Sequence, residues 1–370
     1  MRAIIGCDVH KRYSVFVAID TRGKLSKPVR VEHDRAAFRA YLRTLPPKSE
    51  IAIEATGHWY WIVDEMEQAG HRPHLANPLE AKKRMGKPNK HDALDAGGLA
   101  ILLRNGTLPE SWIPPGDLRD VRELLRTRMA LRDLRTSLKH RIHAAIDRYG
   151  LHNDAISDLF GKTGRDFLLH HLTGLPSETH AMLLTELAAM DDLEPRIAAI
   201  EQRIAEVIVP TPEVQLLLTL PGAGLVLAPL LWLEIGDVER FPRAENLASY
   251  AGLVPRVYSS GGHTYLGHTN HYVNRYLRWG FIEAATCAVR LKAYRDSHIG
   301  ALYQRLLPTR GYGRAIVAVA RHLAEASYWM LRKRQPYRPP QTRIPADRHS
   351  SAGCQRNADF VQVRVSARHV

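Results

Sequence analysis

Four acidic residues occupy positions from which a fold could gather their carboxylates. Asp8 follows a short apolar run, and Glu54 ends a later one. Asp92 and Asp95 are three residues apart at the start of a segment with helical spacing, so both should project from one helix face. Clustered carboxylates repel one another at neutral pH, and hard oxygen ligands select Mg²⁺ or Mn²⁺. The pattern therefore predicts a divalent-cation site suited to phosphodiester chemistry.

Each acid taken alone also has a structural explanation. Asp8 could cap a turn, and Asp92 could be an acid favoured by the dipole at a helix N-terminus. Lys11 and Lys90 could contact a phosphate and His91 could hydrogen-bond a carboxylate, or all three could be exposed side chains beside a basic cleft. Zinc is not favoured, because the nearby histidines belong to no close quartet of ligands.

A second segment that could do chemistry lies in the C-terminal half. Ser259 and Ser260 precede Gly261 and Gly262. A serine hydroxyl is a poor nucleophile unless a metal, a base or a phosphate environment activates it. The two glycines would let a nucleic-acid backbone approach closely, although a flexible loop explains the same residues.

Gly222 and Gly224 form a turn between the apolar run 216–220 and the helical run 225–235. Two helices joined by such a turn resemble a helix-hairpin-helix, in which backbone N–H groups meet a phosphate without reading sequence. Glycine turns between helices are common, so nearby cations must support this interpretation. The cations that could do so, here and at the start of the next helix, are Arg240, Arg243, Arg256, Arg275 and Arg278.

The elements that must position the four acids alternate between strand and helix. Their order is β-β-β-α-β-α-β-α, which predicts a mixed sheet with helices packed on it. Strand ends and a helix start can meet at one edge of such a sheet, which is where the acids fall. The expected strands are 3–7, 14–20, 26–32, 49–54 and 74–77, and the expected helices are 34–45, 59–69 and 91–104.

Two long helices are expected after this domain, over residues 117–149 and 180–208. Apolar residues recur at spacings of three and four in both, which is typical of a coiled-coil-like seam. The second helix should bend or break near Pro195, and the pair could form an antiparallel arm or a dimer contact. A basic stripe on the first helix could contact nucleic acid or be an ordinary solvated face. It consists of Arg128, Arg132, Arg135 and Lys139.

The whole chain is basic. Its 370 residues include 52 Lys and Arg against 38 Asp and Glu, giving a formal charge of +14. Such an excess favours an anionic partner, most often nucleic acid. Three well-separated cysteines form no disulfide framework, and no signal peptide or membrane-spanning run is evident, so we expect a reduced, cytoplasmic protein without a membrane partner.

The motifs around the acids and the serine resemble those of one family, the IS110-family transposases. Its three N-terminal motifs are matched by GCDVHK at 6–11, IEATG at 53–57 and KHDALDA at 90–96. Its C-terminal transposase domain is matched by FPRAENLASYAGLVPR at 241–256, followed by YSSGG at 258–262. The resemblance covers about residues 3–150 and 215–300, and both regions occur in the family's order.

The resemblance implies an α/β plus all-α fold. Its parts are an RNase H-like (RuvC-like) domain over 1–112, a helical or coiled-coil arm over 113–212, and a small helical domain with a helix-hairpin-helix-like turn over 213–334. The remaining residues, 335–370, are expected from their basic, proline-containing composition to form a disordered, nucleic-acid-facing tail. The family's DEDD carboxylates fall on Asp8, Glu54, Asp92 and Asp95, where they would hold Mg²⁺ or Mn²⁺. Its serine nucleophile falls on Ser260, with Ser259 a lesser candidate.

The function implied is that of a DNA transposase or site-specific recombinase of an insertion sequence. It would cleave and rejoin element ends and target DNA, working as a homo-oligomer, a dimer or tetramer, and some relatives are guided by an element-encoded RNA. One rival is a RuvC-like nuclease that uses the same acids to activate water. The other is a non-catalytic nucleic-acid-binding protein.

Overall fold

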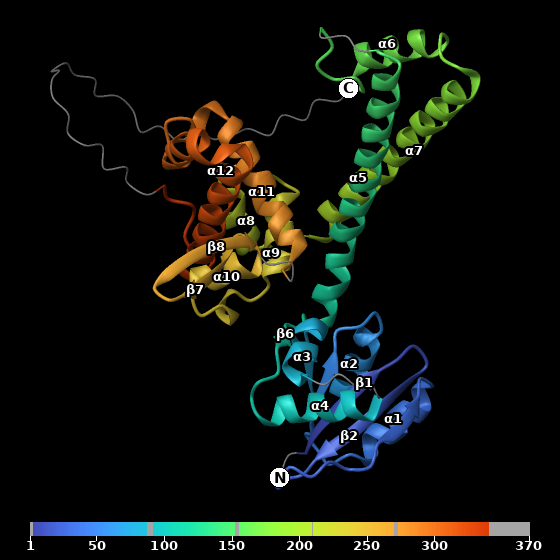
Figure 1. Cartoon of the computed structure of the whole chain (residues 1–370), viewed down its shortest axis with the longest axis vertical. Coiled ribbons are helices and arrows are strands. Elements are labelled where there is room, and N and C mark those ends of the chain that lie inside the picture. Colours follow the sequence, from blue (N-terminus) through green and yellow to red (C-terminus); the bar gives the residue numbers. More distant parts are fainter. Residues whose placement is uncertain (1–2, 87–91, 152–154, 209, 270–272, 340–370) are drawn as a thin grey trace, which may run out of the picture. The chain divides into compact units, whose positions relative to one another are not determined.

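The computed structural model describes the chain apart from residues 1–2, 87–91, 152–154, 209, 270–272 and 340–370 (Figure 1). It contains two compact units, Met1–Val209 and Pro210–Val370, and each is described by itself. The boundary expected at 212–213 lies close to this division, and the finer four-part division stays a prediction. Among the described residues, no helix combines the length and the apolar character needed to cross a bilayer.

A six-stranded mixed sheet forms the base of the first unit, with strand order β3-β2-β1-β4-β5-β6. Strands β1, β2 and β3 pair antiparallel, β1 pairs parallel with β4, and β4 pairs parallel with β5. The short strand β6 closes the far edge in antiparallel orientation. The bounds are β1 Ile4–Val9, β2 Tyr13–Ile19, β3 Val29–Glu32, β4 Glu50–Glu54, β5 Arg72–Ala76 and β6 Glu110–Ser111.

Helices cover both faces of this sheet. Helices α1 (Arg35–Thr44) and α2 (Trp59–Gln68) bury apolar side chains against one face, which includes Ile5, Cys7 and Ile53. Helix α4 (Asp92–Arg104) packs on the opposite face, over β1 and β2. Because side chains alternate along a strand, neighbouring residues of β1 and β4 point to different faces.

The expected strands and helices of this domain are confirmed, with two additions. Helix α3 (Pro78–Met85) follows β5, and its N-cap, Asn77, accepts a hydrogen bond from the Glu80 amide. Strand β6 is only two residues long. Neither element shows a periodicity in the sequence, because α3 is short and polar and β6 is a two-residue strand at the edge of the sheet.

Two antiparallel helices form an arm, α5 (Gly116–Arg148) and α7 (Ser177–Val207). Three ion pairs link them, Arg128–Glu201, Arg135–Glu194 and Arg141–Glu186, and the falling partner numbers show the opposite chain directions. Helix α6 (Lys162–Leu172), which was not predicted, packs into a core shared by both helices. The break expected in α7 is not found, since one helix runs through Pro195 with ion pairs to α5 on both sides of it.

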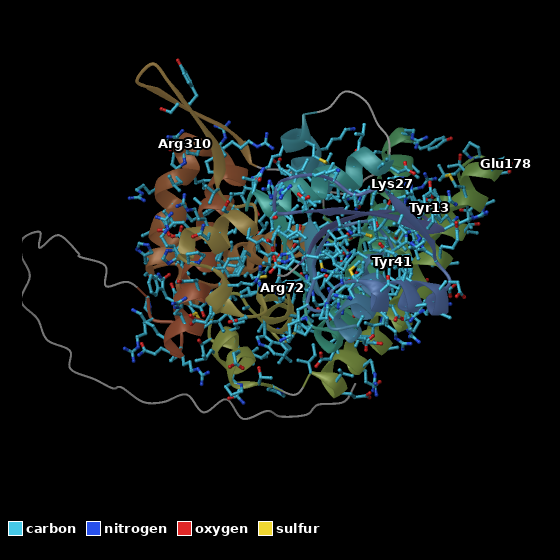
Figure 2. All side chains as sticks on the ribbon, turned by 90° about the horizontal axis from the view of Figure 1, so that it is seen from below. Tyr13, Lys27, Tyr41, Arg72, Glu178 and Arg310 are labelled. Atoms are coloured by element: carbon cyan, nitrogen blue, oxygen red, sulfur yellow. The ribbon has the colours of Figure 1, made fainter. Side chains whose placement is uncertain are left out.

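The second unit is mainly helical but carries a β-hairpin that the sequence did not predict. Gly261 and Gly262 join its two strands with φ angles of 58° and 79°, the positive values that two-residue hairpin turns require. The hairpin extends beyond the helices of its own unit (Figures 1 and 2). The elements are α8 Pro212–Leu218, α9 Leu227–Ile235, α10 Ala244–Tyr250, β7 Pro255–Ser260, β8 His263–Thr269, α11 Arg275–Arg290 and α12 His298–Lys333.

Candidate active site

Strand register places Asp8 and Glu54 at matching positions on one face of the sheet. Cys7 pairs with Ile53 across the parallel β1–β4 ladder, and both side chains enter the core under α1 and α2. The next residue on each strand, Asp8 and Glu54, therefore faces the opposite side, where α4 packs. Glu54 is half-buried at the carboxyl end of β4.

Gly6 brings the start of α4 close to these strand ends. A Cβ atom on Gly6 would lie 1.8 Å from the carbonyl oxygen of Ala96, so only glycine allows this approach. Asp92 lies one helical turn before Ala96 and Asp95 immediately precedes it, which directs the first turn of α4 towards Asp8. The contact between backbone and backbone thus positions the acids.

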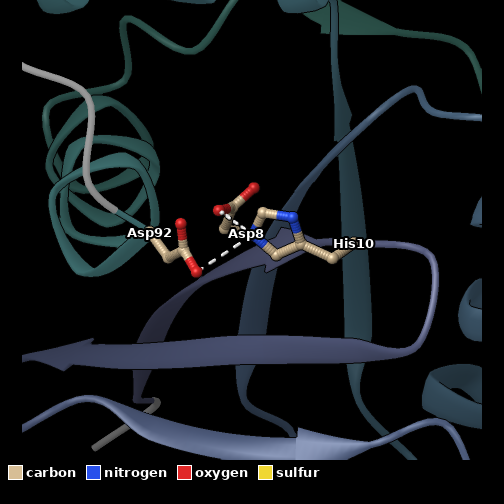
Figure 3. A group of neighbouring side chains, drawn as sticks. All are labelled: Asp8, His10 and Asp92. Atoms are coloured by element: carbon tan, nitrogen blue, oxygen red, sulfur yellow. Dashed lines mark ion pairs between the residues drawn. The ribbon is translucent and has the colours of Figure 1, made fainter.

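Asp8 and Asp92 converge on His10, as Figure 3 shows. The His10 Nε2 atom lies 3.0 Å from Asp8 Oδ2 and 3.3 Å from Asp92 Oδ2. One ligand atom from each of the three side chains lies within 4.8 Å of the others. The His10 nitrogen is buried and makes no well-directed hydrogen bond to either carboxylate. Two carboxylates and an imidazole from β1, the β1–β2 turn and α4 therefore surround one point.

Asp8 is the most buried of the three side chains, with only 8% of its surface exposed. Burial raises the pKa of its carboxyl above the ordinary value, and the charges of Asp95 and Asp92 raise it further, whereas His10 lowers it. Asp95 thus acts on Asp8 through its charge, although it is not among the three side chains that converge. A divalent cation would relieve this repulsion; Asp8 and Asp92 supply the hard oxygen ligands that Mg²⁺ and Mn²⁺ prefer, and His10 supplies a nitrogen.

Tyr13 is a site residue that the sequence did not indicate, whereas His10 was considered beside the acids only as a zinc ligand, which was not favoured. The Tyr13 hydroxyl donates to Asp92 Oδ2 at 3.0 Å, and this bond raises the pKa of the phenol. The Tyr13 ring stacks on His10, with centroids 4.6 Å apart, and the Arg30 guanidinium lies 3.6 Å from its centroid. The signal available was proximity, because both residues border the hairpin turn that follows Asp8.

Of the residues near the acids that were expected to contact a phosphate or a carboxylate, the structure describes only Lys11. Lys11 is exposed on the turn after β1. Lys90 and His91 lie outside the described residues.

The basic stripe on α5 has partners within the arm. Arg128 Nη2 lies 2.6 Å from Glu201, and Arg135 Nη1 lies 2.7 Å from Glu194, both on α7. Arg132 pairs with neighbouring Asp133, and the Lys139 ammonium lies 4.8 Å from the Phe160 ring centroid. All four side chains of the stripe therefore have partners within the first unit. A contact between the stripe and nucleic acid stays a prediction.

The two glycines of the turn in the second unit have different surroundings, one tightly packed and the other open. A Cβ on Gly222, whose φ is 77°, would lie 2.0 Å from the carbonyl oxygen of Ala284, so Gly222 lets α11 pack against the turn. Gly224 is exposed, and nothing lies near its Cβ position. Of the two glycines, Gly224 has the open surroundings that a phosphate would need.

The start of α11 is fixed by its cap rather than by its arginines. Asn274 accepts hydrogen bonds from the amides of Tyr276 and Leu277, and its own amide donates to Glu234 Oε2 at 2.7 Å. Arg275 is exposed and donates to the Tyr276 hydroxyl, while Arg278 is half-buried. Arg256 is exposed at the start of β7.

Ser260 is the last residue of β7 and pairs with His263 across the hairpin. Ser259 is exposed and pairs with Thr264. Gly261 and Gly262 have nothing within 4 Å of their Cβ positions. The backbone beside the predicted nucleophile is therefore open to a large ligand.

Known transposases match both halves of this chain. A model of DEDD transposases of the IS110 type matches residues 5–151, and a model described as the transposase IS116/IS110/IS902 family matches residues 214–300. A probable family 20 transposase of Pseudomonas aeruginosa is 28% identical over 310 residues, covering 82% of this chain and 90% of that protein. The transposase for insertion sequence element IS1111A of Coxiella burnetii is 27% identical over 341 residues, covering 90% and 91%.

A further relative is named for the inversion of a gene. The pilin gene-inverting protein of Moraxella bovis is 29% identical over 223 residues, which covers 57% of this chain and 58% of that protein. The two family matches occur in the order that the motifs predicted, and together they contain the acids and the serine. The chain therefore belongs to the IS110 family of transposases and is a DNA-rearranging enzyme of the kind that insertion sequences encode.

Proposed function

We propose that this transposase cleaves and rejoins DNA with a divalent cation held by Asp8, Glu54, Asp92 and Asp95 and with Ser260 as a covalent nucleophile. The observation that carries the proposal is the convergence of Asp8 and Asp92 from different elements, with Asp95 acting on Asp8 through its charge. Three antiparallel strands followed by two parallel ones are also what a RuvC-like, RNase H-type domain would have.

The acids and their neighbours prepare a site for phosphate oxygens. A bound Mg²⁺ would supply charge stabilisation to the phosphodiester oxygens. Asp8 and Glu54 are held by strand register and Asp92 by the packing of α4, so little reorganisation is needed when DNA binds. Tyr13 fixes the orientation of the Asp92 carboxylate through its hydroxyl.

Ser260 would form a transient link to DNA. Its Oγ–phosphorus bond forms as the bond from phosphorus to the leaving deoxyribose oxygen breaks, the serine loses its proton, and the leaving oxygen gains one. The phosphoserine bond conserves the energy of the broken phosphodiester for rejoining. The open surroundings of Gly261 and Gly262 support this role, because a DNA backbone must reach the serine. The protein would work as a homo-oligomer, and an element-encoded RNA could guide it.

The test is to trap the serine–DNA link. The full chain is incubated with the DNA ends of its element and Mg²⁺, with and without RNA transcribed from the element, and denatured. We expect a protein–DNA adduct for wild type and for Ser259→Ala, which is the matched control, and none for Ser260→Ala or Asp8→Asn.

Two results would contradict the proposal in different ways. Cleavage that persists without an adduct in the double variant Ser259→Ala/Ser260→Ala indicates a nuclease that activates water. DNA binding without any cleavage, unchanged by Asp8→Asn, indicates a non-catalytic binding protein.

A further inference from the structure

The second unit contains a cavity far along the chain from both the glycine turn and Ser260. It lies between the C-terminal part of α12 and residues 335–338, and its volume is about 380 Å³. This volume is within the range of small-molecule sites in proteins. The residues that carry the argument are His322, Trp329, Met330, Lys333, Tyr337 and Arg338.

A reversal of the chain builds the cavity. Arg334 ends α12 in the left-handed conformation, with a φ of 51°, and turns the chain back along the helix. The Gln335 amide donates to the Met330 carbonyl at 3.0 Å, and the Tyr337 amide donates to Thr219 Oγ1 at 2.9 Å. Residues 335–338 are thus tied to α12 and to the end of α8 and form a fixed wall.

One wall of the cavity is an aromatic surface beside a cation. Trp329 is 50% exposed, which is unusual for so large an apolar ring. The Lys333 ammonium lies 4.9 Å from its ring centroid. Arg338 adds a second positive charge to the lining, and the one acid in it, Glu325, pairs with Arg321 at 2.8 Å. An exposed indole with an ammonium over its ring, in a lining that holds a second cation, is suited to a planar, negatively charged ligand.

Two polar atoms in the lining lack partners. His322 Nε2 and the Tyr337 hydroxyl are buried, and neither has a hydrogen-bond partner among the residues that the structure describes. Burial lowers the pKa of His322, which favours the neutral ring, and raises that of Tyr337 to about 12, which keeps its proton in place. A neutral imidazole and a phenol can donate and accept, so a ligand with both kinds of group would satisfy them.

We propose that this cavity binds an unpaired DNA base with its phosphate. A base offers a planar face for Trp329, donor and acceptor groups for His322 and Tyr337, and a phosphate for Lys333 and Arg338. A purely apolar ligand would leave both buried polar atoms unsatisfied, and a simple anion would not use the indole. Strand exchange supplies such bases, because strands must leave one duplex before they join another.

The proposal rests on the DNA-rearranging activity of the family, and not on the cation or the serine. A photocrosslinking experiment tests it on the full chain. Short single-stranded DNA containing 5-iodouracil is bound and irradiated, and the crosslinked peptide is identified by mass spectrometry. We expect the crosslink within residues 322–338 in the wild type, and its loss in Trp329→Ala.

Affinity measurements complete the test. Trp329→Ala should weaken binding of single-stranded DNA about tenfold, the effect of losing one base–aromatic stack, while duplex affinity stays unchanged. Trp329→Phe should restore most of the affinity. Tyr312→Ala is the matched control, because Tyr312 is also on α12, is 51% exposed and does not line the cavity.

A crosslink that maps elsewhere in the wild type overturns the proposal, whatever the variants do. So does an equal loss of single-stranded and duplex affinity in Trp329→Ala, or binding of single-stranded RNA but not DNA. Because the measurements need neither cleavage nor Mg²⁺, they stay informative if the adduct experiment on Ser260 fails. Thermal unfolding of each variant verifies that its fold is intact.

Discussion

The acids and the serine of this transposase are held in opposite ways. The acids lie where a helix packs directly on a sheet, so closely that Gly6 leaves no room for a methyl group under Ala96. Ser260 lies on a two-stranded ribbon whose turn glycines have open space around them. In the proposed mechanism the acids hold a small ion, which needs positions fixed by a core, whereas the serine meets a long polymer, which needs access. The predictions below test this difference, from the largest expected effect to the smallest.

Gly6→Ala should cause the largest loss. The added methyl group would meet the backbone of α4, so the helix must move and the acids with it. We expect a loss of about 3 kcal/mol in unfolding free energy, at the upper end for overpacking, measured by urea denaturation. Gly57→Ala is the control, because its Cβ meets nothing within 4 Å and its stability should hold. Equal stability of the two variants would show that α4 can shift freely.

Mg²⁺ should stabilise the first unit through Asp8. At a concentration one hundred times its dissociation constant, a ligand that binds only the folded state adds about 2.7 kcal/mol. Asp8→Asn should abolish this gain, and because it removes a buried, repelled charge, it should leave stability in EDTA unchanged or higher. Thermal unfolding with and without Mg²⁺ measures both effects. A Mg²⁺-dependent gain that survives in Asp8→Asn would place the cation elsewhere.

Glu65 provides a contrasting carboxylate in the same domain. It is 2% exposed, and Arg39 Nε lies 2.5 Å and Arg35 Nη1 3.2 Å from its oxygens. The hydrogen bond from Arg39 lowers the pKa of Glu65, so its stabilisation is complete above the unfolded value of about 4.3 and is lost as the pH falls through the folded value. Glu65→Gln should cost about 2 kcal/mol at neutral pH.

The same variant tests the direction of the pH dependence. The difference between wild type and Glu65→Gln should shrink as the pH falls below about 4, because the unfolded chain then binds a proton at Glu65 that the folded protein, with its lowered pKa, does not. Glu67→Gln, at an exposed position of the same helix, should show no such trend. A difference that is constant with pH would mean that the arginines do not act on Glu65 through its charge.

Gly262→Ala should have the smallest effect on stability. Its φ of 79° strains any other residue, at a cost of about 1 kcal/mol, but nothing nearby is displaced. We expect the free energy of unfolding of the second unit to fall by about that amount, while the yield of the serine–DNA adduct falls about fivefold. Loss of folding in Gly262→Ala would show that the hairpin is as tightly integrated as the acid site.

The sequence predicted the fold best where the apolar pattern of a segment matches the face that the segment buries. Short apolar runs predicted the strands that carry Asp8 and Glu54, and helical spacing predicted α4 with Asp92 and Asp95. The long helices of the arm followed from the same argument. The convergence of acids could be expected from strand ends meeting a helix start, because chain connectivity within a sheet limits where these ends lie.

What the sequence did not predict depends on contacts between distant residues. The role of Tyr13 requires α4 to bring Asp92 beside it, which no local pattern shows. The partners of Arg128 and Arg135 lie about seventy and sixty residues later on α7, so the stripe alone could not be distinguished from a nucleic-acid surface. The β7–β8 hairpin was missed because its Ser-Ser-Gly-Gly segment was interpreted as a loop or an approach for DNA rather than as a tight turn.

The three arginine–glutamate pairs of the arm have a consequence for its mechanics. A sliding displacement of α7 by one turn would separate Arg128, Arg135 and Arg141 from their partners together, since the pairs share one alignment. The apolar seam alone would tolerate such a slip, because similar side chains recur along it. The charged pairs thus fix the register of α5 against α7, so that the two helices resist sliding along each other.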